Sequence, residues 1–437
     1  MPFRFVHTAD LHLDSPLRSL ALRDPALQAL IGVATRDALT RIVDLCVAER
    51  VDALLIAGDL YDGDQVSMKT ARFLQQELQR LDAAGIATFI IRGNHDALSK
   101  ITRELVFPPS VTVFGALANT KEIDGVLPVA IHGLSFTKPH APESLLPHYP
   151  TAVPGAFNIG LMHSSLNGSV GHDVYAPCAV VDLHGAGYGY WALGHIHLRA
   201  VHQGQATVVM PGMPQGRDIG EAGEKSVTLV TVSDQGAVTL DHRVLAPVRF
   251  DRVTVDVDAA TNWSDLVGLL GQSVRDARRQ AIEDHLVLRP RLTGTTPLAW
   301  RILRDMDMLR EEAVSVAEGI GTVWIDKVEN VTQGRPTSIQ STGLPTAVPA
   351  GLTTALVDGL SQDPAILAAA DREIDDLLKA LPKELRQLLG QTDTATAAAR
   401  DDLLSQGVAE VLARLANPDL ANPDLGTPDL ANPDRAA

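Results

Sequence analysis

FRFVHTADLH, residues 3–12, is an apolar strand that ends in an acidic side chain and an imidazole. Similar polar motifs recur four more times in the first half of the chain, each just after an apolar run that predicts a strand. Because the ligand crevice of an open α/β sheet lies outside the carboxyl ends of its strands, we expect the motifs to converge. The motifs are, in order, Asp10-Leu11-His12, Gly58-Asp59-Leu60-Tyr61-Asp62, Gly93-Asn94-His95-Asp96, His163 and Gly194-His195-Ile196-His197.

Short apolar strands alternate with helical stretches over residues 1–245, which predicts a layered α/β domain. We expect helices over Ala26–Arg50 and Met68–Ala84. The expected strands are Phe3–Thr8, Ala53–Ala57, Thr88–Ile91, Val129–His132, Phe157–Met162, Tyr190–Leu193, Thr207–Met210, Val227–Val232 and Val238–Val244.

Three further segments follow. Residues 246–340 predict a second, small α+β domain, with strands at Phe250–Val257 and Leu286–Leu292 and a helix at Trp263–Glu283. Residues 341–416 combine a linker rich in Pro, Gly, Ser and Thr with two amphipathic stripes that predict helices, Ile366–Leu381 and Leu403–Leu415. Residues 417–437 repeat an Asn-Pro-Asp unit whose prolines exclude a helix, so we expect a disordered tail.

Composition limits the class of protein. Apolar residues are 45% and charged residues 21% of the 437, as in a globular protein. The two cysteines make no disulfide framework and no run reaches the ~20 apolar residues of a membrane span, so we expect a cytoplasmic protein without membrane contact. The net charge of −16 disfavours a broad basic footprint, so phosphate binding has to be local and centred on metal.

The motifs supply carboxylate, amide and imidazole groups, which are the ligands that two neighbouring divalent cations need. Taken singly, each has an ordinary structural explanation, such as a turn after a strand or a histidine satisfied in the core. Taken together and in this order, they predict a metal centre that hydrolyses a phosphate ester.

The set resembles the calcineurin-like metallophosphoesterases, whose motifs are D-x-H, G-D-x-x-D, G-N-H-D, a later His and G-H-x-H. The resemblance implies a four-layered α/β/β/α sandwich with two divalent metal ions, most often Mn²⁺. By motif position, the residues of one metal site are Asp10, His12, Asp59 and His197, and those of the other are Asp59, Asn94, His163 and His195, with Asp59 as the bridge.

The resemblance also implies catalytic residues that are not ligands. His95 would stabilise the transition state or protonate the leaving group. Asp96 would either orient the imidazole of His95 or cap a turn. Asp62 is a third candidate, since bacterial members have Asp where eukaryotic and archaeal relatives carry His.

The residues around the motifs narrow the resemblance to bacterial DNA repair exonucleases of the SbcD/YhaO type, in residues 7–13, 58–62, 190–197, 211–217 and 220–221. Residues 246–340 resemble the capping, DNA-binding domain of that family in position, length and strand–helix–strand outline. This implies a DNA exonuclease with a capacity for endonuclease cleavage, acting as the nuclease subunit beside an SMC-like coiled-coil ATPase and able to form a homodimer. The two amphipathic stripes are then a docking surface for the ATPase, unless they pack together as a helical hairpin.

Four arginines are candidates for DNA contacts: Arg217 in a loop after a strand, and Arg275, Arg278 and Arg279 on the helix of the cap. The alternative for Arg217 is a salt bridge with Glu221 or Asp218, and the alternative for the cap arginines is a solvated helix face with interleaved acids.

Two other functions suit the same motifs. A phosphatase or small-molecule phosphodiesterase would use the same metal centre, because the motifs specify phosphorus chemistry and not the substrate. A non-catalytic scaffold of the repair complex is the second alternative, and the complete set of ligands argues against it.

Overall fold

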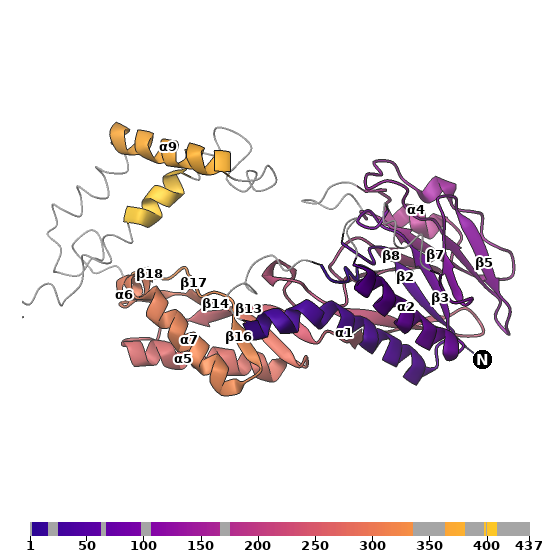
Figure 1. The fold of residues 1–437 in the computed structure, drawn as a ribbon, viewed down its shortest axis with the longest axis horizontal. Helices are drawn as coiled ribbons and strands as arrows, with labels where there is room; N and C mark the ends of the chain where they lie inside the picture. The colour runs from indigo at the N-terminus through magenta and orange to yellow at the C-terminus, as the bar shows by residue number, and fades with distance from the viewer. Residues whose placement is uncertain are drawn as a thin grey trace, which may run out of the picture. The chain divides into compact units, whose positions relative to one another are not determined.

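The computed structural model describes residues 2–15, 25–62, 67–97, 106–166, 175–334, 363–380, 397–398 and 400–408 (Figure 1). The chain divides into two compact units. The first consists of Met1–Arg252, Asp276–Arg289 and Ala317–Asp326, and the second of Val253–Arg275, Pro290–Val316 and Lys327–Ala437. The predicted Asn-Pro-Asp tail lies outside the described residues, as does most of the predicted linker.

Two six-stranded sheets form the first unit. One contains β1 (Phe3–Thr8), β2 (Ala53–Ala57), β3 (Ala87–Ile91), β4 (Val111–Val113), β11 (Ser226–Val232) and β12 (Val238–Val244), in the order β12-β11-β1-β2-β3-β4. The other contains β5 (Asn119–Ile123), β6 (Val129–Gly133), β7 (Phe157–His163), β8 (Tyr190–Gly194), β9 (Ala200–Gln203) and β10 (Thr207–Met210), in the order β5-β6-β7-β8-β10-β9. Strands β1 to β4 run parallel, as do β6, β7, β8 and β10, so their carboxyl ends lie at one edge of each sheet.

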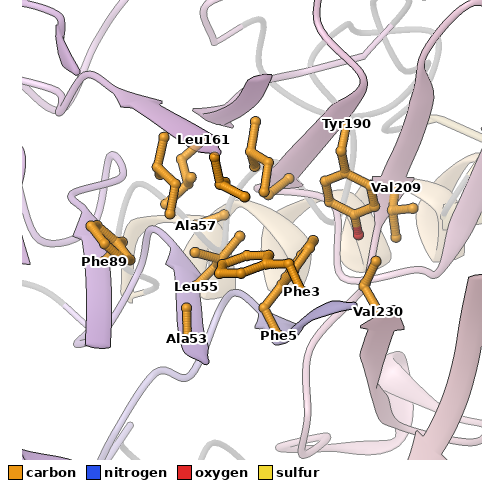
Figure 2. Close-up of a cluster of buried hydrophobic side chains, with 14 of the residues drawn as sticks. Phe3, Phe5, Ala53, Leu55, Ala57, Phe89, Leu161, Tyr190, Val209 and Val230 are labelled. Atoms are coloured by element: carbon orange, nitrogen blue, oxygen red, sulfur yellow. The ribbon is translucent and has the colours of Figure 1, made fainter. Parts of the chain in front are cut away.

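Apolar side chains from both sheets pack against one another to form a core (Figure 2). Phe5 and Leu55 come from the first sheet, and Leu161 and Tyr190 from the second. The rings of Phe5 and Tyr190 meet edge to face with centroids 5.1 Å apart. The strands at the centre of each sheet read as nearly continuous apolar runs because both of their faces are buried.

Helices cover the outer faces of the sheets. The helices α1 (Pro25–Glu49) and α2 (Met68–Ala83) pack through Leu39 and Leu74 on Leu54 of the first sheet. The short helix α4 (Val180–Gly185) packs through Leu183 on Trp191 of the second sheet. The helix α2 begins where the hydroxyl of Ser67 accepts a hydrogen bond from the backbone of Thr70, which satisfies one of its free N–H groups.

A third sheet contains β13 (Val248–Asp256), β14 (His285–Thr293) and β16 (Val323–Ile325) in the order β13-β14-β16, with β17 (Glu329–Asn330) beside β14. The first residues of β13, Val248 and Phe250, pack with Leu27 of α1. This contact explains why the first compact unit extends past residue 245 to Arg252. The elements after β12 are β13 (Val248–Asp256), α5 (Trp263–Gln280), β14 (His285–Thr293), β15 (Thr295–Thr296), α6 (Ala299–Arg304), α7 (Met306–Ile320), β16 (Val323–Ile325), β17 (Glu329–Asn330), β18 (Gln333–Gly334) and α9 (Pro364–Ala380).

Toward the C-terminus, α9 is followed by a helical segment at residues 400–408, and Arg400 of that segment pairs with Asp371 of α9. Ile374 of α9 is buried. The α/β class predicted from the sequence is confirmed by these elements. None of the described helices is both long enough and apolar enough to cross a membrane.

The core between the two sheets leads to the first prediction. Leu55 is fully buried there, so Leu55→Ala should lower the free energy of unfolding by about 2–5 kcal/mol through lost burial and a residual cavity. Chemical denaturation measures this change. Leu117→Ala removes the same atoms from a side chain that is 84% exposed and should change stability by less than about 0.5 kcal/mol. Equal losses from both variants would contradict this account of the core.

Candidate metal centre

The loops that follow β1 and β2 run side by side. The backbone N–H of Asp10 donates to the oxygen of Gly58, and that of His12 donates to the oxygen of Asp59, both at 3.0 Å. These bonds extend the pairing of the two strands beyond their ends. The acidic and imidazole side chains of two separate motifs are therefore held next to each other by main-chain geometry.

Several motif residues have left-handed backbone conformations. The φ angles are 54° at Asp10, 42° at His12, 52° at Asp59 and 101° at His195. Side chains other than glycine rarely adopt such angles, and each costs on the order of 1–3 kcal/mol. These backbone conformations turn the four side chains toward a common point at the strand ends.

Among the residues that the structure describes, three groups of side chains lie close enough to hold a metal ion, with donor atoms within 4.8 Å of one another. The four residues Asp10, His12, Asp59 and His163 are at most 1% exposed. The groups are Asp10 with His12 and His197, Asp10 with Asp59 and His163, and His12 with Asp62 and His95.

The imidazoles are oriented by partners outside the cluster. His163 donates from Nδ1 to the backbone oxygen of Ala57 at 2.9 Å, so its Nε2 faces Asp59 at 3.3 Å and the side-chain oxygen of Asn94 at 3.0 Å. His195 reaches the same oxygen of Asn94 through Nδ1 at 3.2 Å.

His197 is held in the same way. Its Nδ1 donates to Glu221 at 2.8 Å, and its Nε2 faces Nε2 of His12 at 3.2 Å. All seven residues predicted as ligands are thus brought together, while their assignment to individual ions stays a prediction. The seven are Asp10, His12, Asp59, Asn94, His163, His195 and His197.

Three motif glycines leave room for the ring of His163. A Cβ on Gly58 would overlap Nδ1 of this ring, and a Cβ on Gly93 would lie 2.6 Å from Nε2 and overlap Oδ1 of Asp59. A Cβ on Gly194 would overlap the backbone oxygen of Ala57 and lie 2.9 Å from Nδ1. Glycine is required at these three positions because the backbone there lies directly against the ring of His163, a predicted metal ligand.

Burial and charge make this cluster a fit for divalent cations. Burial raises the pKa of Asp10 to about 6 and lowers the pKa of His12 to about 3. Burial also opposes ionisation of Asp59, but the imidazole of His163 holds its pKa well below the usual range. Burying these carboxylates costs free energy unless a cation lies beside them, and imidazole nitrogens that face each other also need a shared partner. These residues therefore fit a pair of divalent ions.

His95 lies at the edge of the cluster. Its side chain is 41% exposed, and its Nδ1 lies 2.7 Å from Oδ1 of Asp62. This hydrogen bond raises the pKa of His95 and holds the pKa of Asp62 below its usual range. The backbone N–H of His95 donates to Asp59, which fixes the imidazole beside the buried donors.

The carboxylate of Asp96 binds backbone N–H groups and not the imidazole of His95. It accepts hydrogen bonds from the backbone N–H groups of Gly93 at 2.7 Å and Leu60 at 3.1 Å. These are the contacts of the turn-cap alternative. The carboxylate beside His95 is that of Asp62, so the pairing proposed for Asp96 from their adjacency in sequence is corrected.

The predicted DNA-binding arginines have acidic or polar partners within the protein. Arg217 contacts Glu221 at 2.6 Å and Asp62 at 3.3 Å. On α5, Arg279 pairs with Asp276, Arg278 donates to the backbone oxygen of Glu283, and Arg275 contacts Gln272. These contacts correspond to the alternatives to DNA binding, and a role in DNA binding stays a prediction for all four.

Comparison with known proteins identifies the family. Residues 3–199 match the calcineurin-like phosphoesterase family, and residues 250–333 match the middle domain of metallophosphoesterase YhaO. The metallophosphoesterase YhaO of Bacillus subtilis (strain 168) is 30% identical over 397 residues, which are 88% of this chain and 96% of that protein. This chain is a calcineurin-like metallophosphoesterase of the YhaO type. It is therefore a hydrolase of phosphoester bonds.

More distant relatives of this metallophosphoesterase are named DNA double-strand break repair protein Mre11. The protein of that name from Sulfurisphaera tokodaii is 26% identical over 218 residues, which are 48% of this chain and 54% of that protein. The one from Saccharolobus solfataricus is 26% identical over 202 residues, 45% of this chain and 50% of that protein. The similarity to these two proteins covers about half of each chain.

The glycine beside His163 gives the second prediction. Gly93→Ala should weaken Mn²⁺ binding by about tenfold or more, because the new methyl group displaces His163 and Asp59. Isothermal titration calorimetry of the free protein measures the affinity. Gly115→Ala is the matched control, since a Cβ there meets nothing within 4 Å. Unchanged Mn²⁺ affinity in a folded Gly93→Ala protein would contradict the proposed centre.

Proposed function

We propose that this metallophosphoesterase is a metal-dependent DNA exonuclease, with endonuclease cleavage as a second mode. The observation that carries the proposal is the His95–Asp62 pair at the exposed edge of a buried cluster of metal-ligand side chains. The relatives named for repair of DNA double-strand breaks favour DNA as the substrate. The match of residues 250–333 to the middle domain of metallophosphoesterase YhaO supports the capping domain predicted for that segment.

In this proposal the seven clustered residues would hold two divalent ions, which we take to be Mn²⁺, and Asp59 would be the ligand that they share. When bound, the ions would lower the pKa of a water and neutralise charge on the phosphate. The chain's own contribution is to hold and move a proton. Asp62 accepts from Nδ1 of His95 and raises the pKa of this imidazole, so the ring can carry a second proton on Nε2. In this proposal Nε2 gives that proton to the oxygen that leaves phosphorus.

The third prediction tests His95. His95→Asn should lower Mn²⁺-dependent release of nucleotides from labelled duplex DNA by about 10²–10⁴-fold, the usual contribution of a positioned acid. Mn²⁺ affinity should stay at the wild-type value, since no ligand is removed. His242→Asn changes a histidine on β12 that pairs with Glu224 and should leave the rate unchanged.

Two results, one with DNA and one with p-nitrophenyl phosphate esters as substrate, would contradict this proposal. Unchanged DNA cleavage by His95→Asn would remove this residue from the mechanism. Hydrolysis of p-nitrophenyl phosphate esters by the wild-type protein, without degradation of DNA, would favour the phosphatase or small-molecule phosphodiesterase alternative.

We also propose that the protein works in the cytoplasm with an SMC-like coiled-coil ATPase, as a homodimer. The support is the amphipathic pattern of α9 and residues 400–408. Leu403 is 49% exposed, and Ile366 and Leu367 are only half buried. An apolar helical surface of this kind suits packing on the helices of a partner.

The fourth prediction concerns this docking surface. Leu403→Asp should abolish co-purification with a co-expressed coiled-coil ATPase, because it places a charge in an apolar contact. DNA cleavage by the isolated protein should persist. Asp375→Asn, which alters an exposed acid of α9, should keep the complex intact. Retention of the complex by Leu403→Asp would contradict docking through this segment.

A further inference from the structure

Arg217 joins two carboxylates, each of which holds a different histidine of the site. Its guanidinium donates to Glu221 at 2.6 Å and to Asp62 at 3.3 Å. Glu221 in turn accepts from Nδ1 of His197, and Asp62 lies 2.7 Å from Nδ1 of His95. One side chain therefore connects the predicted ligand His197 with the predicted acid His95.

We propose that Glu221 and Arg217 are positioning residues of the metal centre. Glu221 fixes the ring of His197 so that Nε2 is presented to a metal ion. Arg217 fixes Glu221 and Asp62 relative to each other. The proposal goes beyond the function given above because it concerns how the centre is held, whichever phosphoester is the substrate.

The geometry of Glu221 suits this role. It lies in the short 3₁₀ turn Ile219–Glu221, where Asp218 accepts a hydrogen bond from the backbone of Gly220 at 2.7 Å. The backbone N–H of Arg217 also donates to the second oxygen of Glu221 at 2.8 Å. Both oxygens of the carboxylate are thus engaged, so it presents one fixed acceptor to His197. A partner on the second nitrogen of a ligating histidine sets its tautomer and its orientation.

The geometry of Arg217 explains why Asp62 serves His95. The second oxygen of Asp62 accepts from the hydroxyl of Ser15 at 2.6 Å and from Arg217. Although His12, Asp62 and His95 lie close enough to hold an ion, the cationic guanidinium beside Asp62 disfavours a metal at that point. His95 therefore stays available for proton transfer.

These contacts differ from an ordinary surface salt bridge. The side chains of Arg217, Glu221 and Asp62 are 22%, 14% and 10% exposed. A planar guanidinium can contact two carboxylates at once, whereas the ammonium of lysine is a point charge on a flexible stem. This predicts that even Arg217→Lys, which keeps the charge, disturbs the site.

The first test measures metal binding without any substrate. Glu221→Gln should weaken Mn²⁺ binding to the full-length protein by about 10–100-fold in isothermal titration calorimetry, the usual effect of losing such a partner. Glu224→Gln removes the same charge three residues away, where Glu224 pairs with exposed His242, and should bind Mn²⁺ like the wild type. Wild-type affinity in Glu221→Gln would overturn the role of Glu221.

The second test separates the two arms of the network with bis-p-nitrophenyl phosphate as substrate at saturating Mn²⁺. Asp62→Asn should lower kcat by about tenfold or more while keeping Mn²⁺ affinity, since it removes the charged acceptor of His95 and leaves the contacts of Glu221 with His197 and Arg217 in place. Arg217→Lys should lower both quantities, and it supplies the test if Glu221→Gln fails to fold. Wild-type values of both in Arg217→Lys, or loss of Mn²⁺ affinity in Asp62→Asn equal to that in Glu221→Gln, would overturn the proposal. A protein that cleaves this ester but not DNA would refute only the nuclease function.

Discussion

The hydrogen bond from Nδ1 of His163 to the backbone oxygen of Ala57 joins the two sheets at the metal centre. Ala57 ends β2 of the first sheet and His163 ends β7 of the second. A second link lies deeper, where His7 of β1 contacts the hydroxyl of Tyr190 and the backbone oxygen of Leu193 at 3.0 and 3.1 Å. Burial lowers the pKa of His7 to about 3, so this link is made by a neutral ring. Because buried polar groups are costly when unpaired, these bonds fix the spacing of the sheets and hence of the donors on both.

The site also concentrates backbone strain, and the strain is compatible with the fold because of where it lies. The left-handed residues Asp10, His12 and Asp59 follow strands at the centre of the first sheet, where hydrogen bonds and apolar contacts hold the chain on both sides. The same conformations in an exposed loop would relax. The rigid sheets therefore determine the positions of donors that the loops alone would not keep in place.

The sequence predicts the central strands well, because buried apolar runs are strong local signals. It also identifies the Gly, Asp, Asn and His motifs whose side chains the structure brings together, while their role as ligands stays a prediction. It misses elements with weak local patterns. β4 has only three residues, and the polar strand β5 at a sheet edge reads as a loop. The contacts of Asp62 with His95 and of Glu221 with His197 were also missed, because they depend on where loops distant in sequence meet. The sequence offered Glu221 only as an alternative partner of Arg217, and the adjacency of Asp96 to His95 pointed to the wrong partner.

Charge at the site affects how a phosphate binds there. Without metal, the cations at the site include Arg217 and the imidazole of His163, whose pKa rises to about 9 because the carboxylate of Asp59 outweighs the effect of burial. The carboxylates of Asp10, Asp59, Asp62 and Glu221 outnumber these cations, which disfavours a phosphate. Two divalent ions would bring four positive charges and offset these carboxylates and the partly ionised Asp96, whose pKa burial raises to about 7. The acidic protein as a whole repels DNA, but this repulsion is screened beyond about 10 Å at ordinary salt. The local charge of the site therefore matters more than the charge of the whole protein, and bound divalent ions would favour the binding of a phosphate there.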